Sequence, residues 1–244
     1  MKKEAQVHFE WANCFKSNGH HDQAIAEYLK ALELDPNLAE AHNNLGIIYK
    51  DKKQYWLAKE EYKKALEINP RLDQAWDNLG ILYLNLGNFE EAISAYKKAI
   101  EINPKNARAH NNLGIAYDKI GDYKKALEEY KKAIEIDPKL GEAHYNLGIV
   151  YGVLERLDDS IKELKKAIEL DFTDTKAHFN LALSFKKKGE ISEAISEYKK
   201  AIELDPQFAE AHYNLGLLYN VIGKEPEALL ELEEFVKLTG RRIG

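Results

Sequence analysis

The chain has 244 residues, a formal net charge of −6, 31% charged residues and 45% hydrophobic residues. An acidic chain lacks the basic surface that nucleic-acid phosphates require, so the composition argues against an RNA or DNA partner. The single cysteine, Cys14, excludes an internal disulfide and a zinc site built from paired cysteines.

The N-terminal segment MKKEAQVHFEW has two lysines but no apolar run behind them, so we do not expect a signal peptide. The rest of the chain has no apolar stretch long enough to span a bilayer, which argues against membrane insertion. We therefore expect a cytoplasmic protein.

Five prolines recur at a fixed spacing, at positions 36, 70, 104, 138 and 206, so every interval is 34 residues or twice 34. A fixed period of this size is the signature of a solenoid. With Ala5 at position 1, the chain divides into seven windows: 5–38, 39–72, 73–106, 107–140, 141–174, 175–208 and 209–242.

The first half of each window is predicted to be a helix. The first window has Trp11, Ala12 and Phe15 at positions 7, 8 and 11, where the later windows have leucine, glycine or alanine, and tyrosine or phenylalanine. These spacings of three and four place the residues on one side of a helix.

The second half of each window is predicted to be a second helix, which in the first window carries Ala24, Tyr28 and Ala31. Small residues on both helices let the two axes approach closely. Asp35-Pro36 and its equivalents end this second helix, because proline disfavours a helical residue before it. Glycine recurs at position 15, where the end of the first helix favours a left-handed residue, as Gly19, Gly87, Gly121, Gly189 and Gly223.

The pattern L-G-x-x-Y followed by A, Y, A and P at fixed offsets resembles the tetratricopeptide repeat family over residues 5–242. The resemblance implies an all-α, right-handed superhelical solenoid of seven helix–turn–helix hairpins in one domain. It also implies a non-catalytic scaffold that binds an extended peptide or a helix of a partner protein in a concave groove lined by the first helices. No nucleophile elbow, dinucleotide-binding, P-loop or HExxH motif occurs, so we expect no enzyme and no cofactor.

Histidine occupies position 4 in six windows, and Trp76 occupies it in the third. Neighbouring first helices lie roughly 8–10 Å apart, too far for their histidines to share a zinc ion with bonds of about 2 Å. Because a tryptophan can replace it, the histidine is expected to pack between helices and to bind no metal. The six are His8, His42, His110, His144, His178 and His212.

Asparagine at position 6 is the main candidate for function, because asparagine is a mediocre helix former. Its amide offers a donor and an acceptor, as an extended peptide backbone does. The similar arrays of O-linked N-acetylglucosamine transferases use such a ladder. The alternative is that the residue is inherited in the family for local hydrogen bonds. The six are Asn44, Asn78, Asn112, Asn146, Asn180 and Asn214.

Aliphatic residues at position 9 are expected to lie beside this ladder and to contact apolar side chains of the ligand. They are Ile47, Ile81, Ile115, Ile149, Leu183 and Leu217. Lysine pairs such as Lys63-Lys64 stand three or four residues from glutamates, the pattern of exposed ion pairs on the back of the solenoid.

The fifth window departs most from the pattern, with Glu155, Ser160, Leu164 and Phe172 at positions that are elsewhere mostly glycine, alanine, tyrosine and proline. Because proline is missing there, we expect a modest bend at DFTDT, residues 171–175.

The seventh window ends with an apolar face formed by Leu229, Leu232, Phe235 and Val236. Solenoids usually cover such a face with a polar cap, so an uncovered face favours a homo-oligomer. A self-assembling structural protein is therefore one alternative function. A regulatory subunit of a glycosyltransferase or secretion complex is another.

Overall fold

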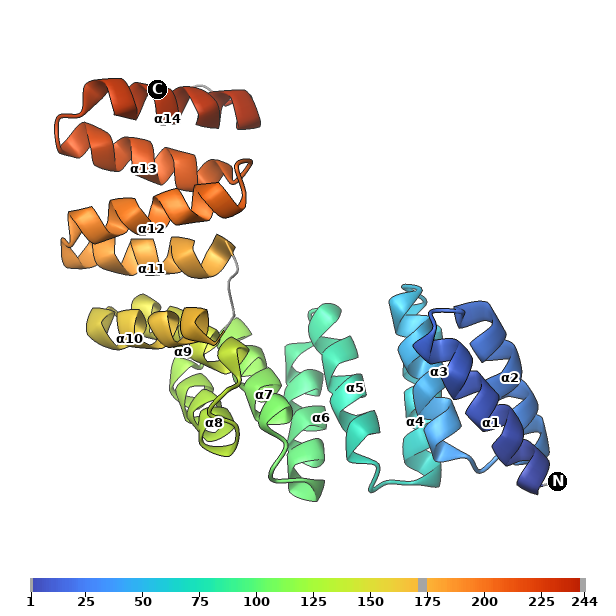
Figure 1. Cartoon of the computed structure of the whole chain (residues 1–244). Helices are drawn as coiled ribbons and strands as arrows, with labels where there is room; N and C mark the ends of the chain where they lie inside the picture. The colour runs from blue at the N-terminus through green and yellow to red at the C-terminus, as the bar shows by residue number, and fades with distance from the viewer. Residues whose placement is uncertain (1, 171–174, 242–244) are drawn as a thin grey trace. The chain divides into compact units, whose positions relative to one another are not determined.

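The computed structural model describes residues 2–170 and 175–241, which form fourteen α-helices and no strand (Figure 1). This confirms the prediction of an all-α chain built from paired helices. The helices are α1 (Lys2–Ser17), α2 (His21–Leu34), α3 (Ala39–Asp51), α4 (Tyr55–Ile68), α5 (Asp73–Asn85), α6 (Phe89–Ile102), α7 (Ala107–Lys119), α8 (Tyr123–Ile136), α9 (Gly141–Val153), α10 (Leu157–Glu169), α11 (Thr175–Lys188), α12 (Ile191–Leu204), α13 (Ala209–Val221) and α14 (Glu225–Thr239).

The helices group into two compact units, residues 1–122 with α1–α7 and residues 123–244 with α8–α14. Unit 1 contains the hairpins α1/α2, α3/α4 and α5/α6, and unit 2 contains α9/α10, α11/α12 and α13/α14. The fourth window contributes α7 to unit 1 and α8 to unit 2. One continuous domain over residues 5–242 stays a prediction, and each unit is described by itself below.

The two helices of a hairpin meet at the small residues that the sequence pattern identified. A Cβ atom added to Gly46 on α3 would lie 2.5 Å from Cε1 of Tyr62 on α4, so the tyrosine ring lies directly against the glycine backbone. The rings of Tyr62, Tyr96 and Tyr198 are fully buried, as are Ala58 and its equivalents on the second helices. Close helix approach and an aromatic filler therefore build each hairpin core.

The turn inside each hairpin has the left-handed backbone that the recurring glycines predicted. Gly19, Gly87 and Gly121 have φ angles of 76°, 76° and 78°. The two windows without glycine keep the same turn, with φ of 59° at Lys53 and 57° at Glu155. A side chain in this region is strained by contact between its Cβ atom and the backbone.

The expected bend in the fifth window involves Phe172 and its neighbours, which lie outside the described residues. The chain on either side is helical, with α10 ending at Glu169 and α11 beginning at Thr175. None of the helices described is long and apolar enough to cross a membrane.

Candidate functional site

The first helices of neighbouring repeats lie side by side within each unit. In unit 1, α3 contacts α5 and α5 contacts α7, and in unit 2, α9 contacts α11. Position 6 of these helices carries the asparagine row, and position 9 carries the aliphatic row. Unit 1 holds Asn44, Asn78, Asn112, Ile47, Ile81 and Ile115, and unit 2 holds Asn146, Asn180, Asn214, Ile149, Leu183 and Leu217. All twelve side chains are half-buried. We call the surface that these residues form within each unit the first-helix face of that unit.

The asparagines of unit 1 hydrogen bond to the preceding repeat. Asn78 Nδ2 donates to Asn43 Oδ1 at 3.0 Å, and Asn44 Nδ2 donates to Asn13 Oδ1 at 3.0 Å. Asn44 Oδ1 also accepts from Lys16 Nζ at 2.8 Å. These contacts are the local hydrogen bonds of the alternative interpretation, and they fix the orientation of each amide.

Asp77 is the most unusual polar residue of this face in unit 1. It stands at position 5, where the neighbouring repeats have Asn43 and Asn111. The amide of Asn112 donates to its carboxylate, but its buried Oδ1 atom has no partner among the described residues. Burial raises the pKa of Asp77, since desolvation penalises the charged form more than Asn112 and Arg108 favour it.

The asparagines of unit 2 also form hydrogen bonds within the protein. Asn180 Nδ2 lies 3.1 Å from Tyr145 Oη and 2.9 Å from the Lys176 carbonyl oxygen. Asn214 Oδ1 accepts from Lys186 Nζ at 3.0 Å. Aromatic residues occupy position 5 throughout this unit, whereas unit 1 has both an aromatic residue, Phe9, and polar residues there. The aromatic residues of unit 2 are Tyr145, Phe179 and Tyr213.

The aliphatic row is partly covered by the hairpin cores. Ile47 packs against the cluster that contains Tyr62, and Leu183 packs against the cluster that contains Tyr198. The remaining exposed part of each side chain lies beside an asparagine. An extended chain on this face would therefore meet amides and hydrocarbon in alternation.

The position-4 histidines have a role that the sequence interpretation missed. In five repeats a histidine–glutamate contact joins the first helix to the second, as in His42 Nδ1 to Glu61 Oε2 at 2.5 Å. The other pairs for which this contact is measured are His8–Glu27, His144–Glu163, His178–Glu197 and His212–Glu231, at 2.5–2.6 Å.

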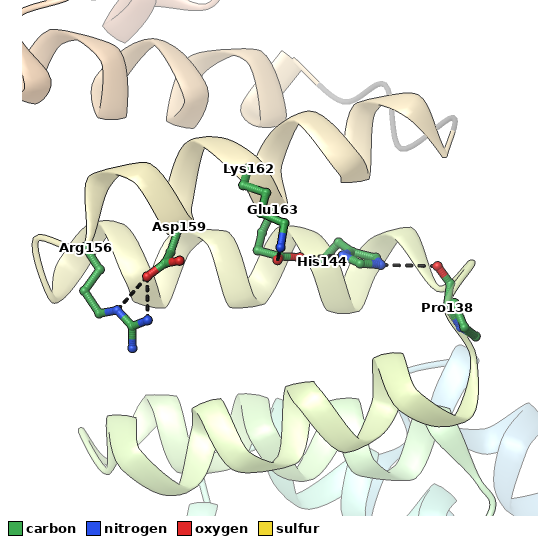
Figure 2. Close-up of polar contacts among 6 residues, drawn as sticks. All are labelled: Pro138, His144, Arg156, Asp159, Lys162 and Glu163. Carbon is green, nitrogen blue, oxygen red and sulfur yellow. Dashed lines mark hydrogen bonds and ion pairs between the residues drawn. The ribbon is translucent and has the colours of Figure 1, made fainter.

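In His144 and His212 the second ring nitrogen lies near a backbone carbonyl. Figure 2 shows His144 between Glu163, at 2.6 Å, and the Pro138 oxygen, at 3.2 Å. His212 is placed in the same way, 3.0 Å from the Pro206 oxygen. A carboxylate and a carbonyl oxygen both accept hydrogen bonds, and one ring nitrogen lies within hydrogen-bonding distance of each. The histidine ties two helices and a turn together.

The third repeat shows that histidine and glutamate vary together. Trp76 replaces the histidine, and its Nε1 atom donates to the Pro70 oxygen at 3.0 Å, so the bond to the turn is kept. Ala95 stands where the other repeats have glutamate. The sequence signal was therefore present in the glutamates at position 23, which are Glu27, Glu61, Glu129, Glu163, Glu197 and Glu231.

The glutamates also bind the lysines of the back face, which confirms the predicted ion pairs. Lys64 Nζ lies 2.8 Å from Glu61 Oε1, and Lys200 Nζ lies 2.8 Å from Glu197 Oε1. Burial favours the neutral acid at Glu61, but hydrogen bonds from His42 and Lys64 outweigh it and lower the pKa of Glu61. Within the described ranges, no three acidic, histidine or cysteine side chains are grouped so as to hold a metal ion.

The apolar residues of α14 differ in exposure. Leu229 is 59% exposed and its neighbour Leu230 is 67% exposed. Leu232, Phe235 and Val236 are half-buried, and the Phe235 ring packs 4.9 Å from the ring of Tyr213. The exposed part of the predicted face is therefore centred on Leu229.

Four family models described as "Tetratricopeptide repeat" or "TPR repeat" match the chain. They match residues 71–139, 12–53 with 183–221, 39–72, and 120–182. Together the matches extend without a gap from residue 12 to residue 221.

Solved structures give the same result. YrrB, described as "a TPR protein with an unusual peptide-binding site", is 29% identical over 75% of this chain and 95% of its own, with a TM-score of 0.64. MamA is 32% identical over 66% of this chain and 94% of its own, with a TM-score of 0.60. The pilF protein of Pseudomonas aeruginosa shares the fold, with a TM-score of 0.77 at 20% identity over 91% of this chain and 98% of its own.

The curated proteins that match are much longer than the matched segment. Protein O-mannosyl-transferase TMTC1 of Mus musculus is 43% identical over 51 residues, which are 21% of this chain and 5% of that protein. The human protein of the same name is 41% identical over 51 residues, 6% of its length.

Proposed function

Because the chain belongs to the tetratricopeptide repeat family, whose fold serves protein interaction, we propose that it is a non-catalytic scaffold that binds a partner protein. The ligand is an extended peptide or a helix of the partner, and the first-helix face of a unit is the surface that holds it. The observation that carries the proposal is the asparagine row beside the aliphatic row on adjacent helices.

The hydrogen bond of Asn78 leaves part of its amide for a ligand. An asparagine amide has two N–H donors and an oxygen with two lone pairs. Asn78 uses one N–H on Asn43, so its remaining groups are held in a fixed direction at a half-buried surface. A preorganised amide binds a peptide backbone with a smaller entropy cost than a mobile one.

The aliphatic row supplies the affinity that backbone contacts alone do not give. Burial of apolar area contributes roughly 25 cal/mol per Å², and six half-buried aliphatic side chains offer such area. YrrB, a structure at 29% identity, is described as having a peptide-binding site, which is consistent with this use of the fold.

The test is a peptide-display selection on the full chain, followed by affinity measurements of the selected peptides. The variant Asn78→Ala, Asn180→Ala, Asn214→Ala removes three amides of the row. We expect it to weaken binding by at least tenfold while circular dichroism shows unchanged helix content.

The matched control removes three exposed amides that lie in loops, with Asn37→Ala, Asn88→Ala and Gln207→Ala. It should bind as tightly as the wild type. If the two triple variants bind the peptides equally well, the asparagine row is structural and the proposal fails.

A second candidate function, assembly of copies of this chain, is favoured by the exposure of Leu229 and Leu230 on α14. Exposed leucines that lie side by side on one helix are typical of a contact surface. A regulatory role in a glycosyltransferase or secretion complex stays a prediction.

A further inference from the structure

Unit 2 contains a pocket of about 120 Å³ between α9, α10 and α11. Its lining includes Ile149 and Leu183 of the aliphatic row and Asn180 of the asparagine row. Leu164 on α10 lies at its inner side, fully buried, whereas Val153 and Lys187 are exposed residues of its rim. The pocket is therefore part of the first-helix face of unit 2.

The pocket exists because the fifth repeat lacks two side chains that other repeats have. Leu164 replaces the tyrosine of position 24. In the first repeat, Tyr28 Oη donates to Asn13 Oδ1 at 2.5 Å, so a tyrosine at this position reaches the residue at position 9. In the fifth repeat that residue is Ile149, and the shorter leucine leaves the space before it open.

Gly152 provides the second missing side chain. Position 12 is glycine only in the fifth repeat; in the others it is Lys16, Lys50, Leu84, Asp118, Lys186 and Asn220. A Cβ atom on Gly152 would lie 3.2 Å from Ser160 Oγ, so any side chain there would crowd the pocket wall.

The two serines of the wall do not make the pocket a polar site. Ser160 Oγ donates to the Gly148 oxygen at 2.7 Å and lies 2.8 Å from Ser184 Oγ. Ser184 Oγ donates to the backbone carbonyl oxygen of Asn180 at 3.0 Å. Their hydrogen-bonding groups are therefore occupied within the protein, and the pocket offers its ligand mainly hydrocarbon.

The volume of the pocket is suited to a single aliphatic side chain of the ligand. An apolar protein cavity of roughly 150 Å³ accepts benzene, so 120 Å³ suits the smaller isobutyl group of leucine or the thin chain of methionine. An indole ring is too large for it.

The charge at the rim of the pocket indicates which residue of the peptide should stand next to the anchoring side chain. Among the described residues, no acidic side chain lines the pocket, and Lys187 Nζ donates one hydrogen to the Gly152 oxygen at 3.2 Å. An ammonium group has three donors. A carboxylate on the ligand would complement this fixed positive charge.

We infer that this pocket anchors a leucine or methionine side chain of the bound peptide, with an adjacent aspartate or glutamate of the same peptide on Lys187. The inference rests on the proposed function and names the sequence class that unit 2 recognises. Asn180 then lies beside the peptide backbone next to the anchoring leucine or methionine.

The probe is an acetylated nonapeptide of glycine and serine with a central leucine–aspartate pair. Matched peptides carry alanine in place of leucine, or asparagine in place of aspartate. Methyl NMR of the full chain at millimolar peptide should show shifts at Ile149, Leu164 and Leu183 with the leucine peptide. The alanine peptide should bind at least tenfold more weakly, as expected when one leucine loses its burial.

The deciding variant is Leu164→Tyr, which fills the pocket with the residue that five other repeats carry at position 24. The hydroxyls of Tyr62 and Tyr198 are buried beside aliphatic residues without a partner among the described residues, so the fold accepts tyrosine there. Leu232→Tyr makes the same change in the seventh repeat and is the matched control. We expect Leu164→Tyr to abolish the shifts of the leucine peptide and Leu232→Tyr to keep them.

The inference is overturned if the wild type shows no shifts with the leucine peptide, if the alanine peptide binds equally well, or if Leu164→Tyr keeps full affinity. The proposed function fails on a different result, because the display selection and the asparagine variants do not depend on the pocket. If the asparagine variants lose affinity for the selected peptides but Leu164→Tyr does not, the scaffold role stands and only the side-chain anchor is wrong.

Discussion

Lys53 and Glu155 hold a left-handed backbone at the hairpin turn, with φ of 59° and 57°. Glycine takes this conformation without contact between a Cβ atom and the backbone, and five other repeats have glycine at the same position. The side chains of these two residues therefore lower the free energy of unfolding relative to glycine at the same positions.

We predict that Lys53→Gly and Glu155→Gly each raise the free energy of unfolding by roughly 0.5–1 kcal/mol. Glycine relieves the backbone strain of the folded state, and this gain exceeds the loss caused by the greater conformational entropy of the unfolded chain. Denaturant unfolding measures the change. The control Lys52→Gly, at φ of −78°, should lower stability, because that backbone suits any residue. Stabilisation by Lys52→Gly would contradict the conformational argument.

Asp77 carries a second residue-scale prediction, with a defined pH dependence. Its native pKa is raised above the ordinary value of 3.8, so ionisation at neutral pH destabilises the folded state. This penalty is fully present above the native pKa and disappears as the pH falls through that pKa toward 3.8.

Asp77→Asn should therefore raise the free energy of unfolding at pH 7 by about 1 kcal/mol, and the gain should shrink in acid. The change places at position 77 the residue that neighbouring repeats have at Asn43 and Asn111. Asp51→Asn, at an exposed site, is the control and should have little effect. A gain that stays constant down to the acid range would contradict the assignment to ionisation.

At the scale of the helix pair, the histidine–glutamate contact joins first and second helices, and its replacement by Trp76 and Ala95 keeps only the bond to the turn. The two positions are separated by 19 residues, as in His42 and Glu61. They form one packing unit in the hairpins that have both residues.

A double-mutant cycle tests this unit. Ala95→Glu alone places a carboxylate at a buried site beside an indole, and Trp76→His alone loses aromatic area. The double variant restores the pair of the other repeats, so we expect a favourable coupling energy of about 1–2 kcal/mol. The free energies of unfolding of the four proteins give this coupling directly. Additive effects of the two changes would mean that the contact contributes nothing.

The sequence predicted the helix pairs well because each depends on short-range periodicity and on residues that recur seven times. It does not predict the histidine–glutamate contact, because the two residues lie on different helices and Trp76 at one of the histidine positions favours a packing role. It also does not predict the pocket: Leu164 departs from the repeat pattern, but an empty volume depends on how three helices meet. The repeat pattern predicts the positions of the asparagine row, but the hydrogen bonds to the preceding repeat depend on how neighbouring hairpins pack.

At the scale of the whole molecule, the chain consists of two compact units, each with its own first-helix face. Position 5 differs between the units: unit 2 has Tyr145, Phe179 and Tyr213, whereas unit 1 has Phe9, Asp77 and the buried Asn43 and Asn111.

Self-association through α14 is tested at this scale. We predict that Leu229→Glu with Leu230→Glu reduces any concentration-dependent increase in mass seen by light scattering and leaves helix content unchanged. Charged side chains on both copies would repel across a shared contact. The control pair Val221→Glu and Leu204→Glu changes exposed apolar residues on α13 and α12. A wild type that is monomeric at high concentration would remove this candidate function.

Trp76 and Ala95 have a consequence for how the chain reaches its native state. Arrays of near-identical hairpins misfold by pairing helices from different copies, because the wrong partner looks like the right one. If α5 paired with α4, Trp76 would face Glu61, but the single N–H of its indole donates to the Pro70 oxygen and would leave the carboxylate without a donor. If α3 paired with α6, His42 would face Ala95 and lose its acceptor. Because the third hairpin differs from the others, pairing its helices with those of a neighbouring repeat loses contacts that the correct pairing keeps. This difference favours the correct pairing of α5 with α6 and of α3 with α4.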